Sequence, residues 1–435
     1  MKRHRPRGRL TPACLRLPIV TAFTLLAAAG TDPVGAQDTA ALGGGALFRD
    51  DVAGTRTEPE FALDRINLGG FTLDSSVTGS VGYDSNVFNQ QDARGDAFFL
   101  VTPQLNLNRD SGRNRLSLSA SGLLRRQARL TAEDSEGYNG TLSDSLSLSD
   151  GAGVNATITA ARTPEPRGTS GVGNGNAEPV VRHDFSGSAG GSVTLGAISL
   201  GGSVRASRQR FDDVELRQGG RASQAFRDTD ALSAGVEAGV PLGTNLTGLI
   251  DVAYDVQRSP NADPLFDRDA HGISAQLGLQ GYLSQLIAAQ VRIGWRTRNF
   301  DNPRYSNFRG IYYSGTVDWY VLEFISLRAT ADRYFGNSGI GNAAGANVDR
   351  ESLTAFYDPT PSLRVTATGA HTRERYREAD LTDNRREASV SARYLFTRHL
   401  NASLRLARTE LRSTDQRILD SYSATSVSLG TTYRF

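Results

Sequence analysis

The chain has 435 residues, 38% of them hydrophobic, and a formal net charge of only +2. A charge this close to balance disfavours a nucleic-acid-binding protein, which concentrates basic residues on one face. The chain shows neither a break in composition nor a long helical period, so a single large sheet is expected rather than several soluble domains.

The first 36 residues have the pattern of a secretory signal peptide. Five basic residues precede an apolar run at residues 17–29, and the small side chains of Val34 and Ala36 precede a cleavage point. An apolar run of about thirteen residues is too short to span a bilayer as a helix. We therefore predict export, with residues 1–36 removed. The mature chain then contains no cysteine, so disulfide and thiol chemistry are not expected.

Residues 37–70 are rich in Gly, Asp, Glu and Pro without periodicity, which predicts a flexible periplasmic segment. From Phe71 onward the dominant pattern is alternation with period two. In the first such stretch Val77, Val81 and Tyr83 share one face, which suits lipid, while polar residues share the other, which suits water. The pattern predicts eighteen strands, at residues 71–86, 97–109, 114–126, 138–149, 154–162, 184–195, 198–207, 226–240, 246–257, 270–283, 286–298, 311–321, 325–334, 349–358, 363–372, 386–396, 400–408 and 422–435.

The predicted connections alternate in length. Tight turns such as 110–113 and 196–197 follow the even-numbered strands, whereas long polar connections such as 163–181 and 208–225 follow odd-numbered ones. Outer-membrane barrels have this alternation, with short periplasmic turns and long extracellular loops. A soluble β-sandwich has no reason to show it. We therefore predict an all-β fold at residues 71–435, a transmembrane antiparallel up-and-down barrel in the outer membrane of a Gram-negative cell.

Aromatic residues gather at the predicted strand ends, as expected for membrane-interface belts. The outer ends carry Tyr83, Phe99, Phe185, Phe226, Tyr254, Trp295, Tyr313 and Tyr334, and the inner ends carry Trp319, Tyr357, Tyr394, Phe396, Tyr433 and Phe435. One residue does not fit, because Asp144 falls on the lipid-facing register. It predicts a bulge or register shift nearby.

The last strand alternates up to a terminal aromatic residue. Such an exposed amphipathic strand can be captured by edge pairing. Tyr433 and Phe435 are therefore predicted to act as an assembly signal for the barrel-assembly machinery.

The segments at 66–73 and 81–88 carry a family resemblance. The sequence Ile-Asn-Leu-Gly-Gly-Phe-Thr-Leu followed by Val-Gly-Tyr-Asp-Ser-Asn-Val-Phe resembles the start of the putative β-barrel porin 2 family, in which a first strand ends in a Y-D-x-N-V/I-F/Y motif. The rest of the chain agrees in length, strand pattern and closing aromatic. The resemblance implies an outer-membrane barrel, often associated with surface-polysaccharide systems and without a well-established catalytic activity.

Catalytic and metal-binding constellations were not found. Of the five histidines, His183, His271 and His371 lie at separate predicted strand ends, where an adjacent Asp is usually a solvated contact. Neither is there a His, Cys and carboxylate spacing that suggests a metal site. The sequence predicts a protein that is not an enzyme and has no cofactor.

The water-facing register supplies the functional hypothesis, because the lumen of a barrel this size can hold an aqueous channel whose fixed charges set selectivity. The alternation places two sets of charged residues inside, the basic Arg205, Arg292, Arg296, Arg328, Arg364, Arg393 and Arg405 and the acidic Asp251, Asp255, Asp318 and Asp332. Either the arginines favour anions, with Arg292, Arg296, Arg328 and Arg405 central, or the charges pair across strands as structural networks.

The function predicted is a porin-like channel for passive passage of hydrophilic solutes, with anions favoured. Two alternatives remain open, a barrel component of surface or exopolysaccharide export and a structural or adhesin barrel without transport. The expected partners are outer-membrane lipid, lipopolysaccharide, the barrel-assembly machinery and either small anionic solutes or a polysaccharide. Nucleic acid is not an expected partner.

Overall fold

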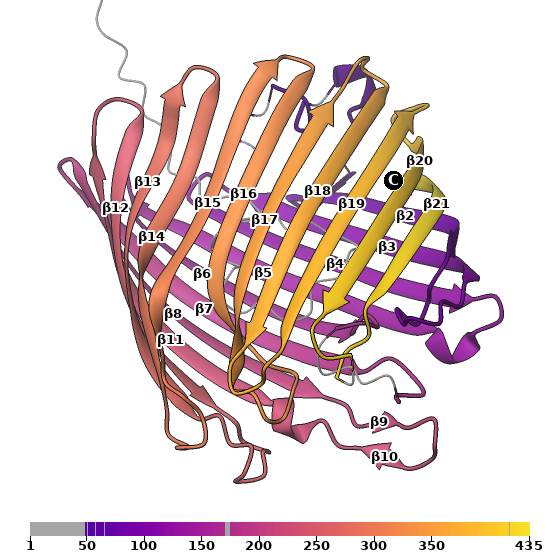
Figure 1. Cartoon of the computed structure of the whole chain (residues 1–435). Coiled ribbons are helices and arrows are strands. Elements are labelled where there is room, and N and C mark those ends of the chain that lie inside the picture. The colour runs from indigo at the N-terminus through magenta and orange to yellow at the C-terminus, as the bar shows by residue number, and fades with distance from the viewer. Residues whose placement is uncertain (1–47, 50, 57, 65, 170–174, 417) are drawn as a thin grey trace, which may run out of the picture.

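A computed structural model describes residues 48–435 except 50, 57, 65, 170–174 and 417, so the predicted signal peptide lies outside the described residues. In this part of the chain, a sheet of nineteen strands consists of the short β1 and eighteen strands that close into a barrel (Figure 1). Each barrel strand pairs antiparallel with the next in the chain, β8 pairs with β11, and β21 pairs with β2. Closure leaves the barrel without a free edge.

The eighteen barrel strands correspond one to one with the predicted strands. Their bounds are β2 (Phe71–Asp84), β3 (Asp96–Asp110), β4 (Asn114–Gln127), β5 (Ser135–Ser149), β6 (Ala152–Pro164), β7 (Val181–Leu195), β8 (Ile198–Phe211), β11 (Thr229–Pro241), β12 (Leu246–Arg258), β13 (Ala270–Ser284), β14 (Ile287–Phe300), β15 (Phe308–Leu322), β16 (Ile325–Asn337), β17 (Gly345–Tyr357), β18 (Leu363–Tyr376), β19 (Thr382–Leu395), β20 (Leu400–Ser413) and β21 (Tyr422–Arg434).

The remaining elements are small. The strand β1 (Ile66–Leu68) pairs only with the start of β2, and β9 (Val214–Glu215) pairs with β10 (Arg221–Ala222) in the connection after β8. Three single-turn 3-10 helices are η1 (Pro59–Phe61), η2 (Thr131–Glu133) and η3 (Ala225–Arg227). Among the described residues, no helix has the length and apolar character needed to cross a membrane.

Connection length distinguishes the two ends of the barrel, as predicted. At one end, which we call the turn end, the strands are joined by two to five residues. At the other, the loop end, the connections have five to seventeen residues, and β9 and β10 lie there, at the bottom of Figure 1. Several strands extend further toward the loop end than predicted. For example, β17 begins at Gly345, where Gly345 and Ala346 pair with Asn337 and Gly336 of β16 and continue the ladder beyond the predicted start.

The period-two alternation places apolar side chains outside and polar ones inside. On β12, Ile250, Val252 and Tyr254 are exposed on the outer face, while Asp251 and Asp255 lie on the inner face. The outer faces of the other strands are similarly apolar, which is the surface that hydrocarbon requires.

Asp144 stays on the outer face of β5. The predicted register shift is present between Ser147 and Ser149, but it lies closer to the turn than Asp144 and leaves the pairing of Asp144 with Leu116 regular. The Asn114 side-chain amide donates a hydrogen bond of 2.6 Å to the Asp144 carboxylate. The outward carboxylate is therefore satisfied by a neighbour at the start of β4.

Two of the predicted belt aromatics are not on the outer surface. Phe226 belongs to η3 and packs against Phe266, with ring centroids 6.2 Å apart. Tyr334 shares the inward register of β16 and packs in a cluster near Val348. Phe226 precedes the start of β11 and therefore has no strand register. On β16 the alternation places Tyr334 on the same inner face as Asp332, so its assignment to the outer belt was inconsistent with the period-two pattern.

Candidate functional site in the barrel lumen

The inner faces of β4 to β7 carry hydroxyl side chains in two rows, which we call the hydroxyl wall. One row is formed by Ser119, Thr141, Thr159 and Ser186, and the next by Ser117, Ser143, Thr157 and Ser188. Hydroxyl pairs join neighbouring strands, at 3.2 Å for Thr141 with Thr159 and 3.2 Å for Ser143 with Thr157. The wall is polar without fixed charge.

Arg205 continues the second hydroxyl row on β8, where it lies opposite Ser188 and Ser233. A cavity of about 490 Å³ lies between the hydroxyl wall and charged side chains that include Arg296 and Arg298. Two kinds of polar surface therefore face each other across this part of the lumen.

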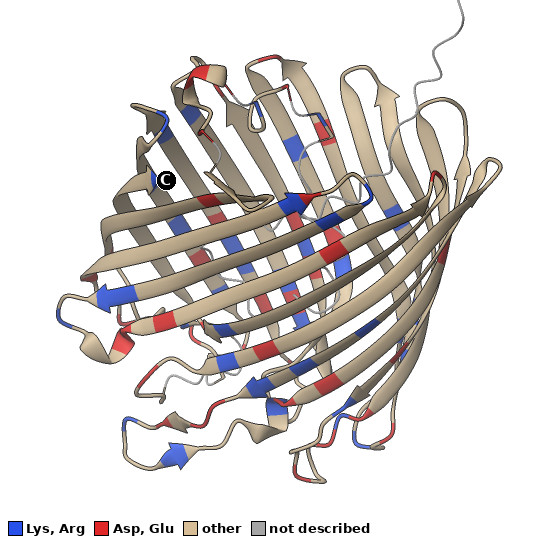
Figure 2. Ribbon diagram, turned by 180° about the vertical axis from the view of Figure 1, so that it is seen from behind, with Lys and Arg blue, Asp and Glu red and all other residues tan. Residues whose placement is uncertain are grey.

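The inner faces of β11 to β16 carry arginines that form ion pairs with carboxylates. Arg328 binds both oxygens of Asp318 at 2.7 and 2.8 Å, and Asp318 is 0% exposed. Arg296 and Arg298 both approach Asp255, at 3.1 and 3.4 Å. Figure 2 shows acidic and basic positions interspersed over the strands. Arg298 was not among the residues predicted to face the lumen, although the same alternation places it inside.

Arg292 forms an ion pair with a carboxylate three strands away. It lies on β14 and contacts Glu237 of β11 at 2.9 Å, over the intervening β12 and β13. Gly278 of β13 lies opposite Arg292, and a Cβ there would be only 3.0 Å from the Arg292 Cγ. Glu237 also lies opposite Asp251, whose carboxylate accepts a 3.0 Å hydrogen bond from Gln276. The missing side chain at Gly278 thus gives Arg292 room to neutralise one of two adjacent acids.

The charges on β16 to β20 are arranged differently. Asp332 lies opposite Arg350 of β17. Arg364 faces the lumen on β18 and donates a 2.7 Å hydrogen bond to the Arg56 carbonyl oxygen. Arg393 and Arg405 are exposed on the inner faces of β19 and β20. Within the part of the chain that the structure describes, neither of these two arginines has an ion pair.

Residues 48–49 and 51–56 lie against the inner wall at the turn end, and we call them the wall-docked segment. Val52 is 2% exposed and Ala53 0%, and Val52 packs with Tyr320 and Ala288. The backbone is bonded to the wall as well, with Ala53 N donating to the Glu323 carbonyl oxygen at 3.0 Å. Composition alone predicted a flexible segment here, and these contacts were not expected.

Further hydrogen bonds fix both ends of the wall-docked segment. Phe48 N donates to the Asp318 carboxylate at 3.3 Å, and the Tyr282 hydroxyl donates to the Phe48 carbonyl oxygen at 2.8 Å. Gly54 N donates to the Asp358 carboxylate at 3.0 Å. The segment therefore runs along the inner wall from β13 to the turn after β17 and covers the Asp318 ion pair.

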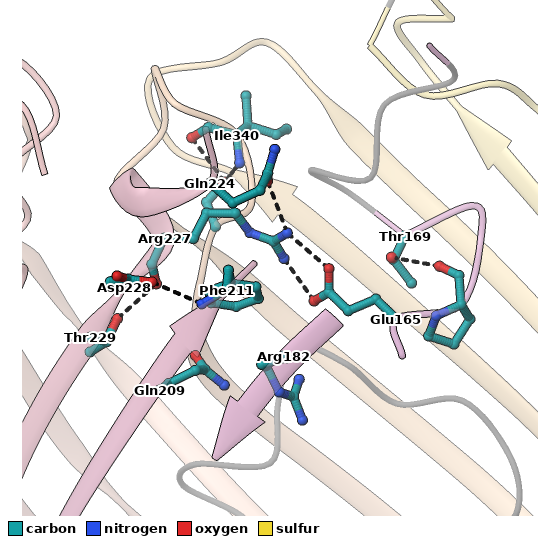
Figure 3. A network of polar contacts seen from close by, with 12 residues as sticks. Glu165, Thr169, Arg182, Gln209, Phe211, Gln224, Arg227, Asp228, Thr229 and Ile340 are labelled. Atoms are coloured by element: carbon teal, nitrogen blue, oxygen red, sulfur yellow. Dashed lines mark hydrogen bonds and ion pairs between the residues drawn. The ribbon is translucent and has the colours of Figure 1, made fainter. Parts of the chain in front are cut away.

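At the loop end, the connection after β6 is held by two buried ion pairs. Arg227 binds both oxygens of Glu165 at 2.8 Å, an arrangement visible in Figure 3. Arg167 binds both oxygens of Glu133 at 2.9 and 2.6 Å. All four side chains are buried, so these contacts fix the connection against its neighbours.

The same connection reaches the opposite side of the mouth. Gly168 accepts a 2.8 Å hydrogen bond from Arg385 of β19, and the Arg167 carbonyl accepts one of 2.7 Å from Asn89. Around the shorter arc of the barrel, β6 and β19 are separated by β5, β4, β3, β2, β21 and β20. The connection therefore crosses the mouth of the lumen.

A second tie at the loop end involves Arg268. Its guanidinium is buried and donates to the carbonyl oxygens of Ser338 and Ile340, both at 2.6 Å. Burial lowers the pKa of the Arg268 side chain from its ordinary value, yet a guanidinium remains charged at physiological pH. The carbonyls supply the partial negative charge that this buried cation needs.

The strand-end histidines do not form a constellation. His183 contacts Asp212 at 3.2 Å and His271 contacts Asp301 at 3.6 Å, and both contacts are solvent-exposed. No group of three or more His, Cys, Asp or Glu side chains within the described residues is arranged to hold a metal ion.

A closed antiparallel barrel with an apolar exterior and a polar, charged lumen defines an outer-membrane protein of the porin type. Residues 58–435 match the family described as putative beta-barrel porin 2, and the chain belongs to this family. No curated protein matches the chain.

Several solved outer-membrane barrels are similar in structure. OpdQ of Pseudomonas aeruginosa is 11% identical, with a TM-score of 0.43, over 87% of this chain and 99% of that one. OpdK of the same organism is 12% identical, with a TM-score of 0.44, over 83% of this chain and 98% of that one. The ferric-catecholate import receptor Fiu from E. coli K12 is 10% identical, with a TM-score of 0.44, over 83% and 81%.

Proposed function

We propose that the protein is a passive channel for small hydrophilic solutes across the outer membrane, with a preference for anions. The observation that carries the proposal is the continuous polar surface inside a closed barrel, formed by the hydroxyl wall on one side and by charged side chains on the other. Such a surface replaces part of a solute's hydration as the solute passes. A barrel that served only as a scaffold would not need it.

The connection that crosses the loop end favours small solutes over a polymer. Its buried ion pairs, such as Glu165 with Arg227, hold it in place across the mouth. The anion preference is supported by Arg393 and Arg405, whose charges face the lumen without an ion pair in the described chain. Fixed charges of one sign favour the passage of the opposite sign.

The hydroxyl wall favours a second candidate, a conduit for carbohydrate in a surface-polysaccharide system. Serine and threonine hydroxyls both donate and accept hydrogen bonds, as sugar hydroxyls do. Rows such as Ser119, Thr141 and Thr159 would offer a repeating chain equivalent positions on successive strands. This candidate requires the crossing connection to move aside.

Reconstitution distinguishes these proposals. The purified full-length barrel should conduct ions in planar bilayers, and its reversal potential under a KCl gradient should show chloride preference. Liposomes containing it should swell in small sugars but not in long oligosaccharides. Absence of any conductance would reject the channel, cation preference would reject the anion hypothesis, and swelling in long oligosaccharides would favour the conduit.

We also propose that residues 1–36 direct export and that the closing strand, with Tyr433 and Phe435, is recognised by the barrel-assembly machinery. The support for the second point is geometric, because β21 pairs with β2 and thereby closes the barrel. Outer-membrane lipid and lipopolysaccharide would then surround the apolar exterior.

A further inference from the structure

Four arginines gather on the inner wall toward the turn end, and we call them the turn-side arginine patch. They are Arg364 on β18, Arg393 on β19, Arg405 on β20 and Arg434 on β21. Each alternates with outward apolar residues, so all four face the lumen; Arg405, for example, lies between the exposed Leu404 and Leu406. Four neighbouring strands therefore contribute one guanidinium each.

The patch brings like charges together. Arg364 and Arg393 lie directly opposite each other in the β18–β19 register. Arg434, on β21, adds a further positive charge near Arg393. Like charges at opposite positions on adjacent strands destabilise a sheet unless a counter-charge is present.

None of the four arginines forms an ion pair with a carboxylate in the part of the chain described. Arg405 lies opposite Ser391 and Ser428, and Arg434 lies opposite Ser76. Arg364 has the Arg56 carbonyl oxygen as its hydrogen-bond acceptor rather than a carboxylate. On β11 to β16, by contrast, Arg292, Arg296 and Arg328 each form an ion pair with a carboxylate.

We infer that the turn-side arginine patch is a binding site for a small solute bearing phosphate or several carboxylate groups. Guanidinium groups bind such oxygens bidentately and stay charged at physiological pH. Arg393 and Arg405 are exposed to the lumen, so a solute can reach them. The inference rests on the proposed function to the extent that the solute must enter the lumen, and it names the class of solute that the channel favours.

Equilibrium binding tests the site without requiring transport. Full-length barrel purified in detergent is titrated calorimetrically with inorganic pyrophosphate at low salt. The wild type should bind with saturation, and the Arg393→Gln, Arg405→Gln variant should lose about tenfold in affinity, which corresponds to about 1.4 kcal/mol. Binding should weaken as KCl is raised above 0.1 M, where screening acts over about 10 Å.

Arg205→Gln is the matched control, because it removes an inward arginine that also has no ion pair in the described residues but lies on β8. Its affinity for pyrophosphate should stay within about twofold of wild type, since Coulomb interactions across a water-filled lumen are weak. All variants should show heat-modifiable mobility, the sign of a folded barrel.

The outcomes separate the site from the channel. No saturable pyrophosphate binding by the wild type, or an equal loss in Arg205→Gln, overturns the site even if the barrel conducts. Saturable binding that depends on Arg393 and Arg405, in a barrel that shows no conductance, supports the site while rejecting the channel.

Discussion

Asp318 and Arg328 lie directly opposite each other on β15 and β16, and the guanidinium binds both carboxylate oxygens at 2.7 and 2.8 Å. The carboxylate is fully buried and also accepts the Phe48 N–H at 3.3 Å. A buried pair with its hydrogen bonds satisfied is stable as a unit, whereas either member alone is not.

We expect Asp318→Asn to destabilise the barrel by about 3 kcal/mol, because it leaves the Arg328 charge without its partner. The double variant Asp318→Asn, Arg328→Gln should recover most of that loss. Urea unfolding of the purified barrel measures both, and the double-mutant cycle isolates the pair. Simple additivity of the two single substitutions would show that the residues do not act as a pair.

The paired arginines and the turn-side arginine patch should differ in their effect on ion selectivity. Replacing Arg292 and Glu237 together by Gln removes no net charge, so the reversal potential under a KCl gradient should stay at the wild-type value. Arg405→Gln removes one positive charge with no compensating change and should lower the chloride preference. If the neutral double replacement shifts the potential as much as Arg405→Gln, selectivity depends on the pair itself.

The barrel could be predicted from the sequence because each strand can be recognised from its own residues, without knowledge of its neighbours. Val81 and Tyr83 face lipid in any barrel that contains their strand, and turn residues mark where the strand ends. The contact between Arg292 and Glu237 could not be predicted in the same way. It spans three strands and depends on the relative register of β11 to β14 and on the absence of a side chain at Gly278.

The wall-docked segment was missed for a related reason. Its composition is that of a flexible chain, and only Val52 and Ala53 are buried with small apolar side chains. Their partners, such as Tyr320 and Ala288, are inward residues of distant strands that look like ordinary lumen positions in the sequence. Long-range packing by two residues produces no periodicity.

Surface labelling tests the orientation of the barrel. A cysteine replacing Gln218, in the connection between β9 and β10, should react with an impermeant maleimide on intact cells. A cysteine replacing Ser111, in the turn after β3, should react only after the outer membrane is permeabilised. Both side chains are exposed, and both positions avoid adjacent glycines with positive φ, Gly219 and Gly112. The reverse pattern would invert the barrel.

Removal of Phe435 should reduce the amount of assembled, heat-modifiable barrel while leaving export to the periplasm intact. Its backbone N–H donates to the Ser75 carbonyl oxygen at 2.9 Å, and its ring contacts Tyr433 edge-on at 5.0 Å. Phe396→Ala is the control, because Phe396 makes a similar edge contact with Tyr394 at 5.0 Å away from the terminus. Equal assembly of the two variants would argue against a special role for the last residue.

The wall-docked segment should leave the wall when Gly54 is replaced. Gly54 has φ +94°, and a Cβ there would lie 2.7 Å from the Phe356 ring. We expect Gly54→Ala to raise single-channel conductance, since the segment would no longer line the turn end of the lumen. Combined with Ala53→Cys, the Gly54→Ala substitution should also make the cysteine at position 53 reactive with maleimide. Ala53 is fully buried when the segment is docked, so this cysteine should be labelled only after the segment has left the wall.

Gly70→Ala separates this effect from backbone strain. Gly70 has a similar φ of +91°, but nothing lies within 4 Å of a Cβ built there. The Ala53→Cys reporter should therefore stay unlabelled in Gly70→Ala, and conductance should match the wild type. If Gly70→Ala labels and conducts like Gly54→Ala, left-handed strain rather than the collision with Phe356 controls docking. If neither variant differs from wild type, the segment does not restrict the lumen.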